Sequence, residues 1–150
     1  MLDPGDPAPA VSAPNQHGDT VTVDTDGPSV VYFYPADDTP GCTVEAEQFA
    51  TERESYDDAG VTVYGVSVDG VDSHREFAAD VGAEFDLLAD PDGEVAEAFG
   101  VERSGPGGTT PRVTFVLLDG EIERVYDSVS PDGHPRDVLM DLLDDGVVSL

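Results

Sequence analysis

The chain has 150 residues, with 33 acidic side chains against six arginines, no lysine and a net charge of −27. This length suits a single domain over residues 1–150, which buries about 70% of the surface that its unfolded chain exposes. A surface this acidic repels nucleic acid and anionic membranes, so we expect neither as a partner. No signal peptide or membrane span is recognisable, and one unpaired cysteine suits a reducing compartment, so we expect a cytoplasmic protein.

The first third of the chain predicts loops, one short strand and one buried strand. Residues 1–19 are rich in Pro, Gly and Asp and are expected to lie over the surface. Residues 20–23 alternate as a short strand, and a turn follows them. From 29 to 34 the chain is a run of β-branched and aromatic residues that ends at Pro35, which predicts a buried strand.

A helix that carries the only cysteine is predicted after this strand. Thr39 followed by Pro40 is a good helix start, because Thr caps the free amides and Pro fits the first helical position. Cys42 then lies in the first turn, where the free amides and the helix dipole favour a thiolate over a thiol. Glu45 is expected on a face away from the apolar positions, and the helix is expected to end near residues 59–60. The alternative is an inert, buried thiol, but the loop of Pro, Asp, Thr and Gly before Cys42 is expected to be exposed, and a strand-to-loop-to-helix step is where α/β sheets place their sites, which favours a reactive thiol.

The rest of the chain continues the alternation of strands and helices. Residues 61–68 form the next predicted buried strand, parallel to 29–34 because a helix connects the two. Ser73 and Glu76 form a capping box that predicts the next helix, and His74 in its first turn is expected to face solvent. The remaining predicted elements are a strand at 85–88, a helix at 94–99, a hairpin of strands 113–118 and 121–126, and a helix that Pro135 opens. This order predicts an α/β layer fold.

A resemblance to a known family rests on the residues around Cys42. Pro35, Thr39 and Cys42 reproduce the Pro-x-x-x-Thr-x-x-Cys signature of peroxiredoxins. The wider string of residues 32–43 resembles the branch called bacterioferritin comigratory protein, or peroxiredoxin Q. Arg112, which opens the strand at 112–116, resembles the arginine of the family's late core strand. The resemblance runs from residue 5 to about residue 143.

The resemblance implies a thioredoxin-like fold, with a central mixed β-sheet flanked by helices, and a thiol-dependent peroxidase. The Cys42 thiolate is expected to attack hydrogen peroxide or an organic hydroperoxide and to become a sulfenic acid. In the family, the residues matching Thr39 and Arg112 stabilise this reaction together with amides of the first turn, and the residue matching Pro35 shields the thiolate from water. The alternative for Arg112 is a surface ion pair. No cofactor or metal is expected, and the bond before Pro111 is left open between cis and trans.

The chain departs from the branch at one position. Many relatives carry a second, resolving cysteine five residues after the reactive one, where this chain has Glu47. With one cysteine, the mechanism is expected to be one-Cys, with an external reductant: a thioredoxin-like protein, a glutaredoxin-like protein or a small thiol. The branch includes monomers, so we expect a monomer or a weak homodimer. The abundance of Asp, the absence of lysine and the uniform acidity resemble proteins of extreme halophiles.

Four other functions compete with the peroxidase, and the weakest is a purely structural binding module, which gives no reason for Pro35, Thr39, Cys42 and Arg112 to occur together. Another is a redox relay, in which oxidised Cys42 passes its oxidation to a partner protein. A thiol-disulfide oxidoreductase usually needs Cys-x-x-Cys, and the second cysteine is absent. A Cys-His hydrolase needs a histidine beside the nucleophile, but His17, His74 and His134 are predicted away from Cys42.

Overall fold

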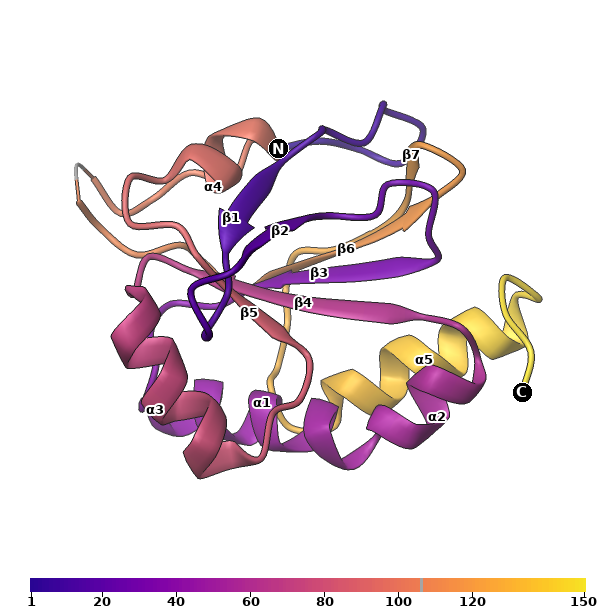
Figure 1. The fold of residues 1–150 in the computed structure, drawn as a ribbon. Helices are drawn as coiled ribbons and strands as arrows, with labels where there is room; N and C mark the ends of the chain where they lie inside the picture. Colours follow the sequence, from indigo (N-terminus) through magenta and orange to yellow (C-terminus); the bar gives the residue numbers. More distant parts are fainter. Residues whose placement is uncertain (106) are drawn as a thin grey trace.

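The computed structural model of the chain describes residues 1–105 and 107–150. Five strands form one mixed sheet in the order β5-β4-β3-β6-β7, and β1 and β2 form a separate antiparallel pair (Figure 1). In chain order the elements are β1 (Ser12–Pro14), β2 (Thr20–Thr22), β3 (Ser29–Phe33), α1 (Pro40–Thr51), α2 (Arg53–Asp58), β4 (Thr62–Ser67), α3 (Val71–Val81), β5 (Asp86–Ala89), α4 (Glu94–Ala98), β6 (Val113–Leu118), β7 (Glu121–Tyr126) and α5 (His134–Asp144).

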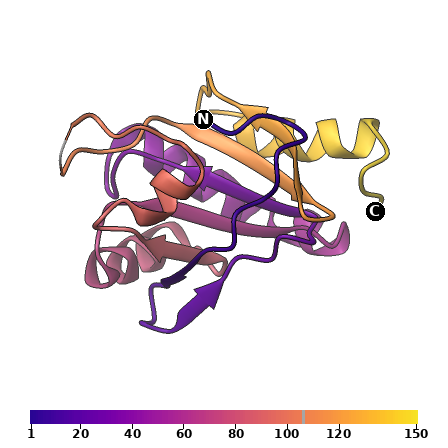
Figure 2. The same ribbon diagram turned by 90° about the horizontal axis from the view of Figure 1, so that it is seen from above.

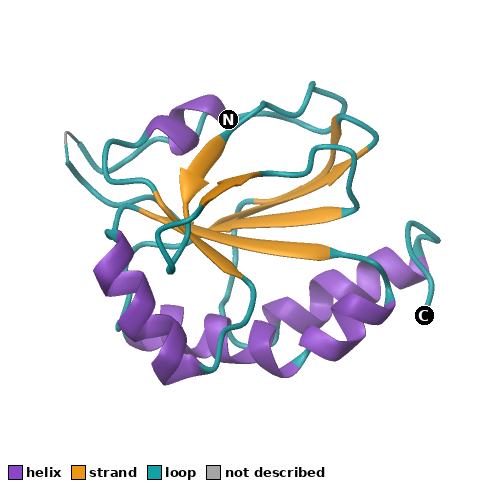
Figure 3. Cartoon of the chain, in the orientation of Figure 1, coloured by secondary structure: helices purple, strands orange, loops and turns teal. Residues whose placement is uncertain are grey.

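The central strand of the sheet is β3, the predicted run of β-branched and aromatic residues. It pairs in parallel with β4 and antiparallel with β6, and all five of its residues are buried. Because a strand that is covered on both faces needs apolar residues throughout, the sequence Ser-Val-Val-Tyr-Phe suits this position. The connections from β3 to β4 and from β4 to β5 are helical and cover the same face of the sheet (Figure 3).

Alternate residues of β3 enter two different hydrophobic cores. Val30 and Tyr32 face α1, α2, α3 and α5, where the Tyr32 ring stacks on the ring of Phe49 with centroids 4.4 Å apart. Val31 and Phe33 face the other side, where they pack with α4 and the β1–β2 pair. The structure is therefore a three-layer α/β arrangement with a thioredoxin-like fold, as expected.

The helices begin and end somewhat differently from the predicted bounds. The predicted helix after Thr39 is interrupted at Glu52, whose φ of −86° and ψ of 2° separate α1 from α2. The predicted capping box is wrong, because α3 begins at Val71 after Gly70, and no side chain caps its first amides. Thr39 is the N-cap residue of α1, but its hydroxyl donates to the carbonyl of Ala36 at 2.9 Å and caps no amide.

The hairpin β6–β7 agrees with the prediction, and Asp119 and Gly120 form its turn with positive φ angles. Among the described residues the one cis peptide bond precedes Pro28, so the bond before Pro111 is trans. Residue 106, in the glycine-rich stretch 104–110, lies outside the described residues. No helix in residues 1–105 and 107–150 is both long and apolar enough to cross a membrane.

The N-terminal segment is more deeply involved in the fold than its composition predicts. Figure 2 shows it crossing the sheet from the β7 side to the β5 side. At β7, the amide of Gly5 donates to the carbonyl of Ile122 at 2.8 Å. At β5, the side chain of Gln16 is buried and pairs with the strand as a backbone would: its Nε2 donates to the Phe85 carbonyl, and its Oε1 accepts from the Leu87 amide, both at 2.9 Å.

Candidate active site

Cys42 lies in the first turn of α1, at the carboxyl end of the central strand. The first helical hydrogen bond runs from the amide of Thr43 to the carbonyl of Thr39 at 2.9 Å, so the amides of Gly41 and Cys42 lie before it. The Cys42 side chain packs into the core on this face of the sheet, and the residue is 1% exposed. The sulfur is therefore placed at the positive end of a helix dipole and shielded from bulk water.

Arg112 connects the sulfur to a buried carboxylate. It directly precedes β6, and its Nη2 donates to the Cys42 sulfur at 3.5 Å while its Nη1 donates to Glu45 Oε1 at 2.8 Å. The Arg112 side chain is 16% exposed and that of Glu45 is fully buried, so the arginine does not form a surface ion pair. Burial by itself lowers the pKa of Arg112, but Glu45 and Cys42 outweigh burial and raise it. The guanidinium is thus a fixed positive charge at the sulfur.

Glu45 is a residue that sequence reasoning missed. It was expected on a face away from the apolar positions, but it is buried, three residues after Cys42 and on the same side of α1. Burial raises the pKa of Glu45 to about 7, although the charge and hydrogen bond of Arg112 oppose the rise. Its second oxygen, Oε2, and the nearby Tyr32 hydroxyl are buried and have no hydrogen-bond partner among the described residues. The spacing from Cys42 was a signal for this position, since residues i and i+3 share a helix face.

Thr39 and Pro35 lie in the loop that leads from β3 into α1. Both are half-buried, and Thr39 is held by its bond to Ala36. Between them Asp38 adopts a φ of +61°, a left-handed conformation that aspartate tolerates better than most residues. The structure therefore brings Arg112 to Cys42 by direct contact and holds Thr39 one helical turn before it, while Pro35 stands at the start of the loop.

Gly41 makes room for the guanidinium. A Cβ atom at this position would lie 3.0 Å from Arg112 Nη2 and 3.4 Å from Cγ of Pro131. The approach to Arg112 is tighter than most contacts of real Cβ atoms, so a larger residue would require the guanidinium to shift by a few tenths of an ångström. The glycine before Cys42 thus allows the arginine to reach the sulfur.

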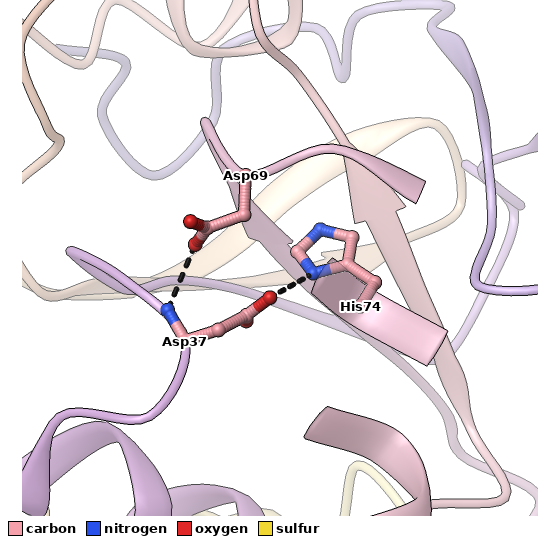
Figure 4. A group of neighbouring side chains, drawn as sticks. All are labelled: Asp37, Asp69 and His74. Atoms are coloured by element: carbon pink, nitrogen blue, oxygen red, sulfur yellow. Dashed lines mark hydrogen bonds and ion pairs between the residues drawn. The ribbon is translucent and has the colours of Figure 1, made fainter. Parts of the chain in front are cut away.

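The prediction that His74 faces solvent is wrong. The residue is fully buried, and its Nδ1 lies 2.8 Å from Asp37 Oδ2 (Figure 4). Its Nε2 lies 3.0 Å from the carbonyl of Leu88. Its position on α3 had a signal in the sequence, because 74, 77, 78 and 81 are spaced as one helix face and Phe77, Ala78 and Val81 are all buried. Asp37 belongs to the loop before Cys42, so His74 contacts this loop directly.

No histidine pairs with Cys42 in the part of the chain that the structure describes. His17 is exposed, and His134 at the start of α5 is buried, with Nε2 2.8 Å from the Thr114 hydroxyl. Burial lowers the pKa of His134 to about 4, although Asp137 opposes the shift. A cavity of about 590 Å³ beside His134 is not lined by Cys42. The arrangement gives no support to a Cys-His hydrolase.

Proteins of similar sequence and structure show which family this chain belongs to. The AhpC/TSA family matches residues 4–125. The chain belongs to this family. Peroxiredoxin Bcp of Escherichia coli K12 is 40% identical over 150 residues, which cover 95% of this chain and 96% of that protein. The crystal structure of peroxidoxin BcpB from Mycobacterium tuberculosis superposes with a TM-score of 0.88 and 32% identity, over 96% of this chain and 98% of that one.

A third relative is the bacterioferritin comigratory protein of Xanthomonas campestris, whose structures were described for its alkyl peroxide reduction activity. It has a TM-score of 0.85 and 30% identity, over 95% of this chain and 99% of that chain. The chain is accordingly a peroxiredoxin of the Bcp and peroxiredoxin Q type, a thiol-dependent peroxidase with one cysteine.

Proposed function

We propose that Cys42 is the peroxidatic cysteine of this peroxiredoxin and that Arg112, Thr39 and Pro35 assist it. The proposal is carried by one observation: the guanidinium of Arg112 contacts the only sulfur that forms a thiolate and is itself held by the buried Glu45. A fixed cation at this point stabilises a thiolate and the negative charge that develops on the peroxide oxygens. The peroxiredoxin family membership supplies the reaction that these groups serve.

The first half-reaction oxidises Cys42. Its thiolate attacks the terminal oxygen of a hydroperoxide, an S–O bond forms and the O–O bond breaks. Cys42 becomes a sulfenic acid, and the leaving oxygen takes a proton and departs as water or an alcohol. Arg112 and the free amides of Gly41 and Cys42 donate hydrogen bonds to the reacting oxygens. The Thr39 hydroxyl already donates its hydrogen to the carbonyl of Ala36, so its oxygen accepts the hydrogen of the hydroperoxide. Pro35 keeps water from the thiolate.

The second half-reaction regenerates the thiol with an external reductant. Position 47, where many relatives have a resolving cysteine, holds an exposed glutamate in this chain. A thiol of another molecule therefore attacks the sulfenic acid, forms a mixed disulfide and releases water, and a second thiol then frees Cys42. The overall reaction converts a hydroperoxide and two thiols to an alcohol or water, a further water and one disulfide. The reductant is a thioredoxin-like protein, a glutaredoxin-like protein or a small thiol.

We propose a cytoplasmic, salt-rich setting in which residues 1–150 act as one domain, as a monomer or weak homodimer, without nucleic acid, membrane or cofactor. The net charge of −27 supports this setting, because its self-repulsion falls as the Debye length shortens from about 30 Å at 0.01 M salt to about 3 Å at 1 M. A melting temperature that rises steeply over this range is expected. Sedimentation in molar salt tests the oligomeric state, and fractionation of source cells tests the location.

Intact-mass spectrometry tests the chemistry. The protein, in molar salt, receives a brief pulse of stoichiometric hydrogen peroxide, with and without 2-mercaptoethanol as a trapping thiol. We expect rapid gain of one oxygen, which the thiol converts to a mixed disulfide, and no such change in Cys42→Ser. A wild-type protein still unmodified after minutes contradicts the role of Cys42. If Cys42 is oxidised rapidly but the protein does not turn over with any reductant, the result favours a redox relay over a peroxidase.

A further inference from the structure

The loop before α1 is held by a buried cluster of hydrogen bonds around Asp37, which lies two residues before Thr39 (Figure 4). The Tyr34 hydroxyl donates to Asp37 Oδ1 at 2.7 Å, and the Ser73 hydroxyl donates to Oδ2 at 2.7 Å. His74 Nδ1 lies 2.8 Å from the same Oδ2, and the Asp37 side chain is 2% exposed. The loop is therefore fastened to the end of β3 and to the first turn of α3.

Asp69, which follows β4, fastens the same loop through its backbone. The amide of Asp37 donates to Asp69 Oδ2 at 2.8 Å, and the Ser67 hydroxyl donates to the same oxygen at 2.7 Å. Asp37 is thus held at two points: its amide donates to the Asp69 carboxylate, and its own carboxylate accepts from the hydroxyls of Tyr34 and Ser73. Because buried polar groups that are fully bonded resist displacement, this cluster fixes Asp37 firmly.

Both ring nitrogens of His74 face hydrogen-bond acceptors. Nδ1 faces the Asp37 carboxylate, which already accepts from Ser73 and Tyr34, and Nε2 faces the carbonyl of Leu88 at 3.0 Å. Both neighbours are acceptors, and the Tyr34 hydroxyl also lies 3.5 Å from Nδ1. His74 and Asp37 therefore form a buried, hydrogen-bonded pair of an imidazole and a carboxylate.

The same three residues have the spacing of a metal site, but their contacts argue against one. One ligand atom from each of Asp37, Asp69 and His74 lies within 4.8 Å of the others. Each of these atoms is already used: Nδ1 donates to Asp37, and Asp69 Oδ2 accepts from an amide and a hydroxyl. A cation would have to displace the proton of Nδ1 and break these bonds. The cluster holds the loop together.

The one-Cys reaction places two opposite demands on this loop. Reaction with peroxide needs Cys42 fixed beside Arg112, whereas an external thiol has to reach a sulfur atom on a residue that is 1% exposed. The five residues from Asp38 to Cys42 connect the fastened Asp37 directly to the sulfur, and Asp38 has a left-handed φ of +61°. Asp37 is therefore a fixed point of the chain five residues before the sulfur.

We propose that Asp37 and His74 are positioning residues of the peroxidase: their hydrogen-bonded pair holds Cys42 in place for peroxide, and its release opens Cys42 to the reducing thiol. The inference rests on the proposed one-Cys function of Cys42. It predicts that loosening the pair changes the two half-reactions in opposite directions. A pair that served folding alone would not produce this split.

The test measures the two half-reactions separately in Asp37→Asn and His74→Gln. Rapid quenching and intact mass give the rate constant for oxidation by hydrogen peroxide, and then the rate constant for mixed-disulfide formation between the sulfenic acid and 2-mercaptoethanol. We expect oxidation to slow by about tenfold and mixed-disulfide formation to accelerate by about threefold or more, in line with changes of order one kT to a few kT in each barrier. Alkylation of reduced Cys42 by iodoacetamide is expected to accelerate as well.

Two variants serve as matched controls. Asp38→Asn removes one negative charge from the neighbouring, exposed position, and His17→Gln replaces an exposed histidine; both are expected to stay within about twofold of wild type. Tyr34→Phe removes one neutral hydrogen bond to Asp37 and is expected to show the same split at smaller amplitude. It also provides a folded variant if the charge changes impair folding.

Parallel loss of both rate constants, or no change in either, overturns the positioning role of the pair. If wild-type Cys42 itself does not form a sulfenic acid, the proposed function fails first. Normal oxidation of wild type with unchanged variants rejects the positioning role alone.

Discussion

Two buried carboxylates lie on either side of the catalytic turn, and their surroundings differ. Glu45 has one oxygen bound to Arg112 and one without a partner among the described residues, and its pKa rises to about 7. For Asp37 burial also acts to raise the pKa, but the hydrogen bond and charge of His74, with the bonds from Ser73 and Tyr34, outweigh burial and lower the pKa. Hydrogen bonding, more than burial, decides which of the two keeps its charge.

The difference gives the Asp37–His74 pair and the Glu45–Arg112 pair different roles. Asp37 is saturated with hydrogen bonds and suits a permanent anchor. Glu45 accepts from only one nitrogen of Arg112, Nη1, which leaves Nη2 to donate to the sulfur.

The largest effect is expected from Arg112→Gln. Loss of the cation removes the donor from the sulfur and should lower the rate constant for peroxide oxidation by about 10²- to 10³-fold, the usual effect of removing one transition-state donor. Arg124→Gln removes the same charge from an ion pair with Asp141 on the outside of the molecule and should change the rate by about twofold at most. Stopped-flow or quenched mass spectrometry compares the two. Similar losses in both variants would mean that overall charge, rather than contact with Cys42, governs the rate.

The next effect is on stability, in Asp37→Asn. Loss of the buried carboxylate leaves His74 without its charged hydrogen-bond partner and should lower the free energy of unfolding by about 3 kcal/mol at neutral pH. Because the pKa of Asp37 is depressed in the folded state, its stabilisation is full above about 3.8, the ordinary pKa of the group, and is lost as the pH falls through the folded pKa. Urea denaturation should therefore show wild type and variant converging below pH 3.8. A pH-independent difference would contradict the ionised state of Asp37.

Glu45→Gln should show the opposite pH dependence. The folded pKa of Glu45 is raised from 4.5 to about 7, so its contribution to stability is full below pH 4.5 and declines as the pH rises to about 7. Glutamine does not ionise, so the free energy of unfolding of the variant should gain on that of wild type over this window. The same denaturation series measures it. A constant gap from pH 4.5 to 7 would show that Glu45 keeps its ordinary pKa.

The smallest effect is expected from Gly41→Ala. The added methyl group lies 3.0 Å from Arg112 Nη2 and should shift the guanidinium by a few tenths of an ångström, which slows oxidation several-fold. Alanine in a helix also stabilises by up to about 1 kcal/mol relative to glycine. A variant that melts higher yet reacts more slowly separates positioning from stability. An unchanged rate would show that the arginine has more room than the structure gives it.

Most of the fold was predictable, because its signals are local. The buried β3 follows from a run of β-branched and aromatic residues, the hairpin from Asp119 and Gly120, and the start of α1 from Thr39 and Pro40. What local signals missed was the sheet contact made by Gln16, because no residue near it in sequence takes part. The alternation of apolar and polar residues predicts strands, but it carries no signal for a side chain that hydrogen-bonds to a strand edge.

The site was predictable in part for a similar reason. The family resemblance predicts that Arg112 lies beside Cys42. The sequence pattern, by contrast, predicts that Glu45 and His74 lie on the surface. In a chain with 33 acidic residues the default for a carboxylate is solvent, and the partners that make burial tolerable lie 67 and 37 residues away. The helical spacing of Glu45 and His74 was a signal that each lies on a buried helix face. It did not show which residue would pair with each side chain.

The N-terminal segment has a consequence for self-association. Gln16 occupies the hydrogen-bonding groups of Phe85 and Leu87 on the outer side of β5, and residues 5–8 occupy those at the start of β7. An open strand edge is the usual template on which another chain adds a strand and aggregates. A second copy of this protein would therefore find these stretches of the sheet edge already occupied. In a solvent where salt has screened the charge that keeps molecules apart, the covered stretches still oppose the addition of a foreign strand.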